Sequence, residues 1–406
     1  MNIKAILACG TAAAMLAAGS ANAAKVILHD VGGVTGSAAE KDFAIAAAYW
    51  GSTFTNNVTI QLDVGFNALP PNVIGSTGSA RMNYLVSNWE NRVNATKSNS
   101  TLDQTLVLPT LSGGGASLVT NGVDATGNND TTSQVYSDAD KYADYVLYMN
   151  TAVGKAIGAN VSPNQIDGAV TFSSDFAFDF DPTDGISAGH MDFLGVAIHE
   201  IGHALGFVSG VDFFDEYGGP NGPGYGLLGY DLNDTSIFSA LDMFRYSNDP
   251  HNLGPGGPVL DETVGTHSYF SIDGGHTALF GNSVSTGYYN GDGNQASHWK
   301  DAEGANVCGP QLGIMDPTFC YAQMGEVTGL DLAAFDAMGW NLSVDALADN
   351  GSYRATTGSI FASIGSNASH FVSYAPEPGT WALMIGGFGA VGVSMRRRTR
   401  ASVSFG

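Results

Sequence analysis

One segment, residues 192–207, constrains this chain more than any other, because its apolar side chains and its histidines follow the same helical period. Apolar residues recur three or four positions apart and no proline interrupts them, so we expect a helix. In that helix His199 and His203 project from one face, where both imidazoles can bind one metal ion. Glu200 lies one position further round, facing the same cleft. Neutral imidazoles suit Zn2+, and an adjacent carboxylate can take a proton from water, which is the chemistry of a zinc hydrolase.

The alternative is a histidine pair in an ordinary buried helix, with both rings hydrogen-bonded inside the core. Two features favour the metal site over this alternative. The motif has an apolar, helical setting, and Gly206 follows the second histidine. A residue without a Cβ lets a helix end and the chain turn sharply at that point.

A catalytic zinc site needs a third protein ligand and keeps one position for water. The compact pattern H-E-x-x-H-x-x-G-x-x-H would place that ligand at position 209, where this chain has Ser209. The third ligand must therefore come from further along the chain. The candidates are four histidines and two glutamates: His251, His267, His276, His298, Glu216 and Glu262. The glutamates are the weaker candidates because turn-forming residues surround Glu216 and precede Glu262.

Two later segments make the pattern more specific. His298 lies in Ser-His-Trp-Lys, and 17 residues later Met315 lies in Gly-Ile-Met-Asp-Pro. Together with the helix, these segments resemble the leishmanolysin-type metzincins, whose third zinc histidine follows a long insertion. Carried over residue by residue, the resemblance implies that His199, His203 and His298 bind zinc. It implies that Glu200 is the general base and that Met315 is the residue of the Met turn. The intervening residues 204–297 are the departure from the compact pattern.

The resemblance implies an α+β fold with a metzincin-like catalytic domain, built from a twisted mixed sheet, an active-site helix and a Met turn. It also implies a zinc endopeptidase that acts on proteins or peptides, with Glu200 as the base that activates water. A non-catalytic cell-surface or matrix binding protein with a structural zinc site is the alternative. A zinc hydrolase that acts on other bonds is a third interpretation.

Patterns around the motif predict further elements. Residues 25–29 and 58–64 read as strands on either side of a helix at 38–50, which suggests a parallel pair joined by a crossover. Residues 168–172 predict a strand just before the metal-site helix, and the resemblance gives it a peptide-docking role at a sheet edge. Residues 71–135 are rich in Ser, Thr, Asn and Gly and show little regular pattern. Other helices are expected near 80–93, 138–157, 239–244 and 328–338, with a strand near 268–272.

Both ends of the chain carry targeting patterns. Residues 1–23 combine a lysine, an apolar stretch and Ala-Asn-Ala, as in a secretory signal peptide. Residues 376–406 begin with Pro-Glu-Pro, continue through an apolar span at 381–395 and end in arginines. They resemble the PEP-CTERM sorting tails of Gram-negative bacteria, and a simple membrane anchor is the alternative. We therefore expect a leader at 1–23 and a metalloprotease domain at 24–341, with an insertion at 208–295. A spacer at 342–375 and the tail at 376–406 follow.

Export determines the compartment and the partners that we expect. The protein would be secreted or held at the cell surface, with the envelope sorting machinery acting on its tail and residues 381–395 associating transiently with the membrane. In an oxidising compartment Cys308 and Cys320 form the remaining pair once Cys9 leaves with the leader. A disulfide between them would bracket Met315, and two free or buried thiols are the alternative.

The acidic composition excludes one class of partner. The chain has 15 Lys and Arg against 38 Asp and Glu, a formal charge of -23. Without Lys4 of the leader, and without Glu377 and four arginines of the tail, the formal charge is -27. Such a field repels phosphate backbones, which argues against nucleic-acid binding, and it suits an extracellular protein that uses Ca2+. Calcium is therefore a second candidate cofactor.

One acidic segment has the spacing of a calcium loop. Asp179, Asp181 and Asp184 alternate with turn residues, but the glutamate that closes an EF-hand is missing. An ordinary turn before the next helix is the stronger interpretation.

Overall fold

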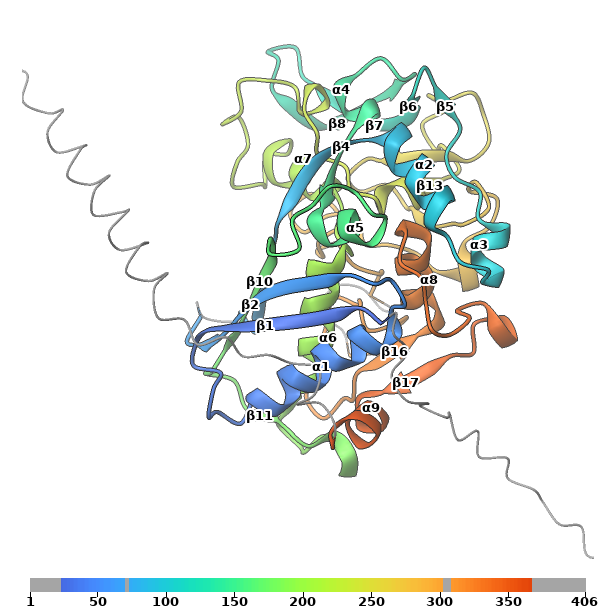
Figure 1. Ribbon diagram of the computed structural model, residues 1–406. Helices are drawn as coiled ribbons and strands as arrows, with labels where there is room; N and C mark the ends of the chain where they lie inside the picture. The colour runs from blue at the N-terminus through green and yellow to red at the C-terminus, as the bar shows by residue number, and fades with distance from the viewer. Residues whose placement is uncertain (1–22, 70–72, 302–307, 367–406) are drawn as a thin grey trace, which may run out of the picture.

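The computed structural model describes residues 23–69, 73–301 and 308–366. Residues 1–22 of the expected leader and the whole expected sorting tail, with its apolar span, lie outside these ranges. None of the helices in the described ranges has the length and apolar character needed to cross a bilayer. The described chain is α+β, with mixed sheets, as the sequence predicted (Figure 1).

The elements follow one another closely along the chain. The strands are β1 (Lys25–Gly32), β2 (Thr59–Asn67), β3 (Gly75–Ser79), β4 (Arg81–Leu85), β5 (Leu111–Ser112), β6 (Gly115–Ala116), β7 (Leu118–Val123), β8 (Asn129–Ser137), β9 (Val146–Asn150), β10 (Ile166–Ser173), β11 (Phe178–Asp179), β12 (Met191–Asp192), β13 (Arg245–Ser247), β14 (Val259–Glu262), β15 (Tyr269–Phe270), β16 (Glu326–Thr328) and β17 (Arg354–Thr356). The α-helices are α1 (Glu40–Thr53), α2 (Val86–Thr96), α3 (Thr101–Thr105), α4 (Tyr142–Tyr145), α5 (Thr151–Ala156), α6 (Phe193–Leu205), α7 (Val211–Tyr217), α8 (Gly329–Met338) and α9 (Thr357–Ile364). The described residues also form five short 3-10 helices: η1 (Pro182–Asp184), η2 (Leu232–Asp234), η3 (Asp242–Phe244), η4 (Leu279–Gly281) and η5 (Ala348–Asn350).

A four-stranded sheet in the order β1-β2-β10-β3 supports the predicted metal-site helix. β1 and β2 are parallel and α1 connects them, which confirms the predicted crossover. β10 adds a third parallel strand, and β3 pairs antiparallel with β10 at the sheet edge. The expectation that residues 168–172 form the edge was therefore wrong. The sequence of β3, Gly-Ser-Thr-Gly-Ser, has no alternation of apolar and polar residues, so the pattern does not predict a strand there.

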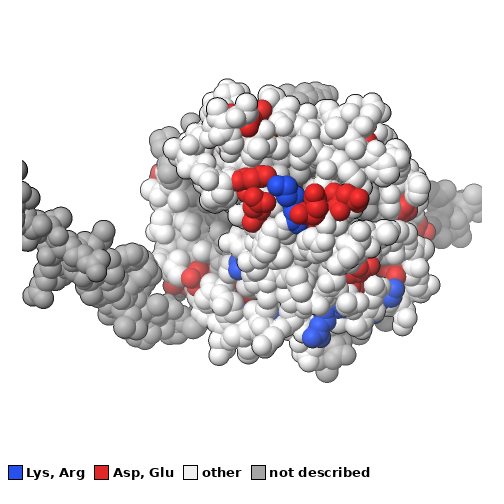
Figure 2. Space-filling model, turned by 90° about the horizontal axis from the view of Figure 1, so that it is seen from above, with Lys and Arg blue, Asp and Glu red and all other residues white. Residues whose placement is uncertain are grey.

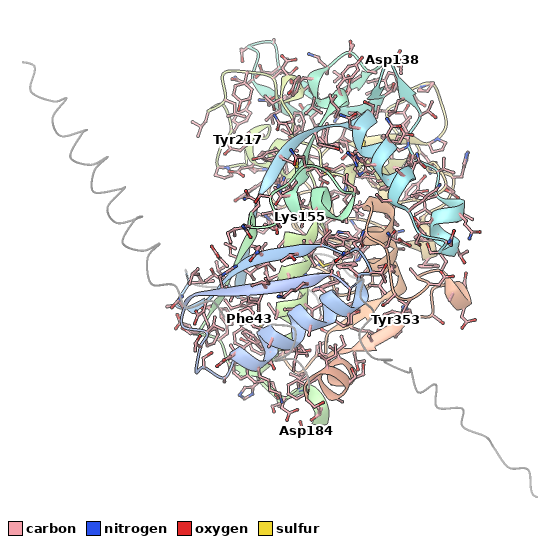
Figure 3. The ribbon with its side chains drawn as sticks, in the orientation of Figure 1. Phe43, Asp138, Lys155, Asp184, Tyr217 and Tyr353 are labelled. Carbon is pink, nitrogen blue, oxygen red and sulfur yellow. A yellow bond between two sulfur atoms is a disulfide. The ribbon has the colours of Figure 1, made fainter. Side chains whose placement is uncertain are left out.

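Aromatic packing joins this sheet to the helices. Phe43 of α1 places its ring 5.1 Å from Phe172 of β10 and 5.3 Å from Phe193 of α6, in edge-to-face contacts (Figure 3). Such pairs contribute about 0.5–1.5 kcal/mol each beyond the area they bury. The indole of Trp50, also on α1, donates a hydrogen bond of 3.0 Å to the carbonyl of Ile198. α1 therefore fixes both the position and the rotation of α6.

A second mixed sheet, in the order β15-β13-β14-β7-β8, lies towards the other end of the molecule (Figure 1). Its strands β13, β14 and β15 come from the expected insertion, while β7 and β8 precede α6 in the chain. β14 pairs parallel with β7 and links the two segments. The insertion 208–295 thus completes a sheet begun by residues 118–137.

Two predicted helices contain strands instead. The expected helix at 80–93 begins as β4 and becomes helical only at Val86, and the expected helix at 138–157 is divided into α4, β9 and α5. The cause is long-range pairing: β4 and β9 form an antiparallel pair with Arg81 opposite Asn150. The local sequence pattern cannot predict that a segment will pair with a strand some 70 residues away. The predicted helix at 239–244 contracts to η3, whereas the strand near 268–272 is present as β15.

Two further findings concern the turn-rich regions. Glu216, expected in a poor helix-forming segment, belongs to α7. The expected spacer is folded back in part, because β17 pairs antiparallel with β16 and α9 buries Thr357 and Phe361 against the body. By contrast, the predicted last helix is present as α8, and Thr328 caps it.

The surface agrees with the acidic composition. Figure 2 shows acidic side chains gathered on one face with few basic ones among them. Lys141 is half-exposed and pairs with Asp231 at 3.2 Å and Asp234 at 3.4 Å. The side chain of Lys155, by contrast, is buried and pairs with Asp167 of β10 at 2.6 Å (Figure 3).

Candidate metal centre

The metal-site helix α6 has clear signals at both ends. Asp192 caps its start: its Oδ1 accepts a hydrogen bond of 2.9 Å from the amide of Gly195. The other carboxylate oxygen accepts hydrogen bonds from the amide of Gly325 and the hydroxyl of Thr357. Gly206 ends the helix with a φ of 133°, a conformation that favours glycine. The end of the helix at Gly206 therefore follows the sequence prediction, and the buried cap Asp192 also ties α6 to the C-terminal segment.

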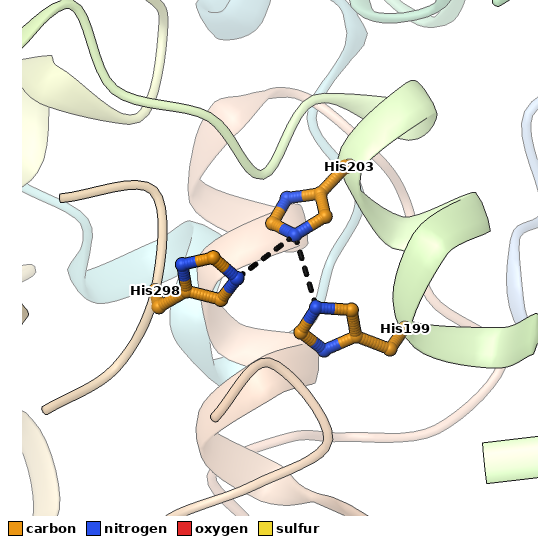
Figure 4. A group of neighbouring side chains, drawn as sticks. All are labelled: His199, His203 and His298. Carbon is orange, nitrogen blue, oxygen red and sulfur yellow. Dashed lines mark hydrogen bonds between the residues drawn. The ribbon is translucent and has the colours of Figure 1, made fainter. Parts of the chain in front are cut away.

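Three histidines converge beside this helix. The Nε2 atom of His203 lies 3.1 Å from Nε2 of His199 and 3.2 Å from Nε2 of His298 (Figure 4). All three side chains are buried. Among the described residues, they are the one group of three or more His, Cys, Asp or Glu side chains whose ligand atoms approach one another this closely.

The outer nitrogen of each ring faces a backbone carbonyl. The Nδ1 atoms of His199, His203 and His298 lie 2.7, 2.6 and 3.2 Å from the carbonyl oxygens of Ile314, Phe207 and Gln295, respectively. Because a carbonyl can only accept, each Nδ1 carries the proton and each Nε2 keeps its lone pair. The three Nε2 lone pairs therefore point towards one another and cannot hydrogen-bond among themselves. A bound cation would stabilise this arrangement.

Burial keeps these imidazoles neutral. It lowers the pKa of His199 to about 3 and that of His203 to about 4, although the hydrogen bond from each ring to a carbonyl opposes the shift. The pKa of His298 lies well below its usual value, first through burial and then through the charges of the other two rings. Neutral imidazole is the form that binds a metal.

The other candidates for a third ligand lie elsewhere. His251 contacts Thr266, His267 contacts Ser283, and His276 is exposed. Glu262 is buried 3.9 Å from the guanidinium of Arg245, and Glu216 lies on α7. Of the candidates, the structure brings only His298 to the histidine pair.

Glu200 is half-buried and faces the edge strand β3. The hydroxyl of Thr77 donates a 2.6 Å hydrogen bond to its Oε2. Burial raises the pKa of Glu200 to about 7, and this hydrogen bond acts in the opposite direction. A Cβ on Gly75 would lie 2.9 Å from Oε1, so only glycine leaves the carboxylate this space. Sequence reasoning missed Thr77 and Gly75 because they lie in a segment with no clear pattern.

Met315 packs against α6 at Gly202, the residue before His203. It is fully buried, and its sulfur is so close to α6 that a Cβ on Gly202 would lie 2.6 Å away. The predicted disulfide between Cys308 and Cys320 is present and brackets this residue. The loop is thereby closed around the carbonyl of Ile314, which orients His199.

Asp331 of α8 connects two of the site segments. One of its carboxylate oxygens accepts from the indole of Trp299 at 2.8 Å and from the amide of Met315 at 3.2 Å. The other accepts from the amides of Ile314 at 3.0 Å and Thr328 at 2.7 Å. The buried carboxylate thus holds the neighbour of His298 and the loop that orients His199. The capping pattern predicts the start of α8, and nothing in the local sequence reveals this second role.

The loop of His298 is anchored where the compact pattern would have its ligand. The amide of Ser209 donates a 2.9 Å hydrogen bond to Oγ of Ser297. Asp212 accepts from that hydroxyl at 2.5 Å and from the amide of Ala296 at 2.7 Å. Ser209 therefore joins the chain after α6 to the distant segment that supplies the third imidazole.

The calcium interpretation gains no support. Asp179 accepts hydrogen bonds from the amides of Asp181 and Ser187, and Asp181 caps the 3-10 helix η1. Together with Asp184 they do not form a converging group of carboxylates within the described chain. The segment is a turn before α6, the stronger of the two interpretations.

The donor set fits zinc. Zn–N bonds of about 2.0–2.1 Å at tetrahedral angles place ligand nitrogens about 3.3 Å apart. The two shortest Nε2 separations, 3.1 and 3.2 Å, are close to this value. Three neutral imidazoles without a fourth protein ligand among the described residues leave one coordination position open.

Comparison with known proteins identifies the end of the chain. Residues 375–398 match the PEP-CTERM protein-sorting motif, which confirms the predicted tail. No curated protein and no solved structure matches the chain. The motif implies interaction with the exosortase sorting machinery. It indicates that this is an exported protein, sorted to the cell surface of a Gram-negative bacterium, and the described body contains a buried three-histidine cluster that could bind a metal ion.

Proposed function

We propose that the chain is an exported zinc-dependent endopeptidase of the metzincin type. One observation supports this most: three buried Nε2 lone pairs from His199, His203 and His298 converge on one point, and Glu200 follows His199 on the same helix. Zinc bound by three imidazoles lowers the pKa of water and polarises a carbonyl oxygen. Structural zinc sites usually have four protein ligands, so an open position favours catalysis over the alternative of a surface protein with a structural metal.

The protein's own groups supply the proton transfers. Glu200 takes a proton from water as it attacks the scissile carbonyl, and then delivers that proton to the leaving amine. The hydrogen bond from Thr77 orients the carboxylate for this task. Since the pKa of Glu200 is raised towards 7, the group can both accept and release a proton near neutral pH.

The substrate class follows from the sheet edge. β3 is the edge strand of the four-stranded sheet, and the side chain of its residue Thr77 donates a hydrogen bond to Glu200. An extended peptide can pair with such an edge, and its carbonyls would then run past the three histidines. We therefore assign the peptide-docking role to β3, and not to the strand at 168–172 for which the sequence predicted it.

The test combines zinc content with hydrolysis of casein by residues 24–375. Wild type should hold about one zinc per chain and cleave casein. A protein that binds zinc and cleaves no peptide would favour the structural site instead. Substrate profiling with esters and amides would then identify a hydrolase acting on other bonds.

A further inference from the structure

Arg81 is a cation near the metal centre that no described carboxylate neutralises directly. It begins β4, directly opposite Asn150 of β9. Cross-strand partners share a face of the ribbon. The side chain of Asn150 donates hydrogen bonds of 3.0 and 3.2 Å to the carbonyls of His203 and Ala204, so this face meets the end of α6. Arg81 therefore projects on the same side as the metal-site helix.

Two aromatic rings hold the guanidinium in place. Its central carbon lies 5.4 Å from the ring centre of Tyr148 and 5.9 Å from that of Phe213. Contacts of this kind restrain an arginine without using its hydrogen-bond donors.

No carboxylate of the described chain lies within ion-pair distance of Arg81, and its buried Nη1 has no hydrogen-bond partner there. Asp212 and Asp242 act on it only at longer range. Both already accept from serine hydroxyls and backbone amides. An unpaired guanidinium is unexpected in a chain with a formal charge of -23, where carboxylates are abundant.

We infer that Arg81 binds a carboxylate of the substrate and gives the proposed peptidase a preference for acidic peptides. This inference rests on the proposed function of the histidine site. The guanidinium presents a planar fork of donors that matches a carboxylate. The carboxylate comes from an acidic side chain or from the C-terminus of a peptide.

The experiment uses three matched fluorescent peptides: one with Glu and a C-terminal amide, one with Gln and the amide, and one with Gln and a free C-terminus. We compare kcat/KM for wild type, Arg81→Ala and Arg81→Lys. Wild type should prefer one carboxylate peptide to the neutral one by about 10-fold or more, Arg81→Ala should lose that preference, and Arg81→Lys should keep part of it. The preferred peptide identifies the source of the carboxylate.

Arg92→Ala is the matched control, because Arg92 is exposed on α2 and its loss changes the net charge equally. An equal loss of preference in this variant would assign the effect to the overall field and overturn the inference. Equal kcat/KM values of wild type for all three peptides would also overturn it, while the proposed function would stand.

Binding is measured separately, so that the two proposals can fail independently. The zinc-loaded Glu200→Gln protein, with and without Arg81→Ala, is titrated with the same peptides. Tighter binding of a carboxylate peptide that depends on Arg81 supports the inference even if wild type cleaves no peptide. Equal affinity for all three peptides contradicts it.

Discussion

Gly75 on the edge strand β3 lies directly against the carboxylate of Glu200 on α6, two residues along β3 from the threonine that donates a hydrogen bond to it. A strand without side-chain bulk at this point leaves room for the carboxylate against the sheet edge. The edge strand thus shapes the space around the proposed general base, in addition to offering backbone groups to a peptide.

Gly75→Ala should lower activity while leaving metal binding intact. The added Cβ would lie 2.9 Å from Oε1 of Glu200, so the carboxylate must move. We expect a fall in kcat of about 10-fold or more, because small misplacements of a catalytic group are costly. Gly78→Ala on the same strand is the control, since a Cβ there meets nothing within 4 Å. Equal kcat values for the two variants would contradict this role for Gly75.

Glu200→Gln should abolish most peptide hydrolysis without releasing the metal. Glutamine keeps the shape and can still accept from Thr77, but it cannot take a proton. Loss of a general base lowers the rate by about 10²–10⁴-fold. Zinc content and casein cleavage are measured on the same preparation. Retention of full activity would assign proton transfer to another group.

His298→Ala should weaken zinc binding strongly, because a three-imidazole site would lose one ligand. The change is followed by competition with a chelator and by the visible spectrum of the cobalt-substituted protein. His276→Ala, at an exposed position in the insertion that precedes His298, should leave both unchanged. Unaltered zinc affinity in His298→Ala would show that the cluster is not the ligand set.

Asp212→Ala should weaken zinc binding by about 10-fold, since this carboxylate holds the two residues before His298. Asp215→Ala is a close control: it lies on the same helix α7 and accepts hydrogen bonds of 2.8 and 2.7 Å from the amides of Tyr289 and Asn290. Both variants should lose about 1–3 kcal/mol of unfolding free energy. If both weaken zinc binding equally, Asp212 stabilises the insertion in general and has no special effect on His298.

Asp42 should make the protein less stable as the pH rises from about 4 to about 8. Burial, followed by the charge of Asp192, raises its pKa from 3.8 to about 8, and neither carboxylate oxygen has a hydrogen-bond partner in the described chain. The fold prefers the protonated acid, so this stabilisation is complete below pH 3.8 and is lost as the pH rises towards 8. Asp42→Asn should flatten the dependence of unfolding free energy on pH by up to about 1.4 kcal/mol per pH unit.

Asp138→Asn makes the same substitution at an exposed position at the other end of the molecule and is the control for Asp42→Asn (Figure 3). Urea unfolding at several pH values measures both variants. Parallel pH profiles for Asp42→Asn and wild type would show that Asp42 is ionised in the folded protein.

The sequence alone determined the elements whose signals are local. The helical period of α6, its cap Asp192 and its end at Gly206 are encoded within 15 residues, so the pairing of His199 with His203 on one face could be predicted. The crossover from β1 to β2, the start of α8 and the sorting tail carry similarly local patterns. His298 and the disulfide were predicted from family resemblance and cysteine count, respectively, and the structure brings both pairs of segments together.

Only the tertiary structure decided which segments meet. β3 is a run of small polar residues that forms an edge strand because it pairs with β10. β9 lies in a segment with a helical sequence pattern, yet it forms a strand because it pairs with β4. Asp331 and Asp212 look like ordinary helix residues, yet each accepts hydrogen bonds from loops that are distant in sequence. Strand pairing and buried hydrogen bonds join residues that are far apart in the chain. A local sequence pattern contains only one of the two residues, so it cannot predict the contact.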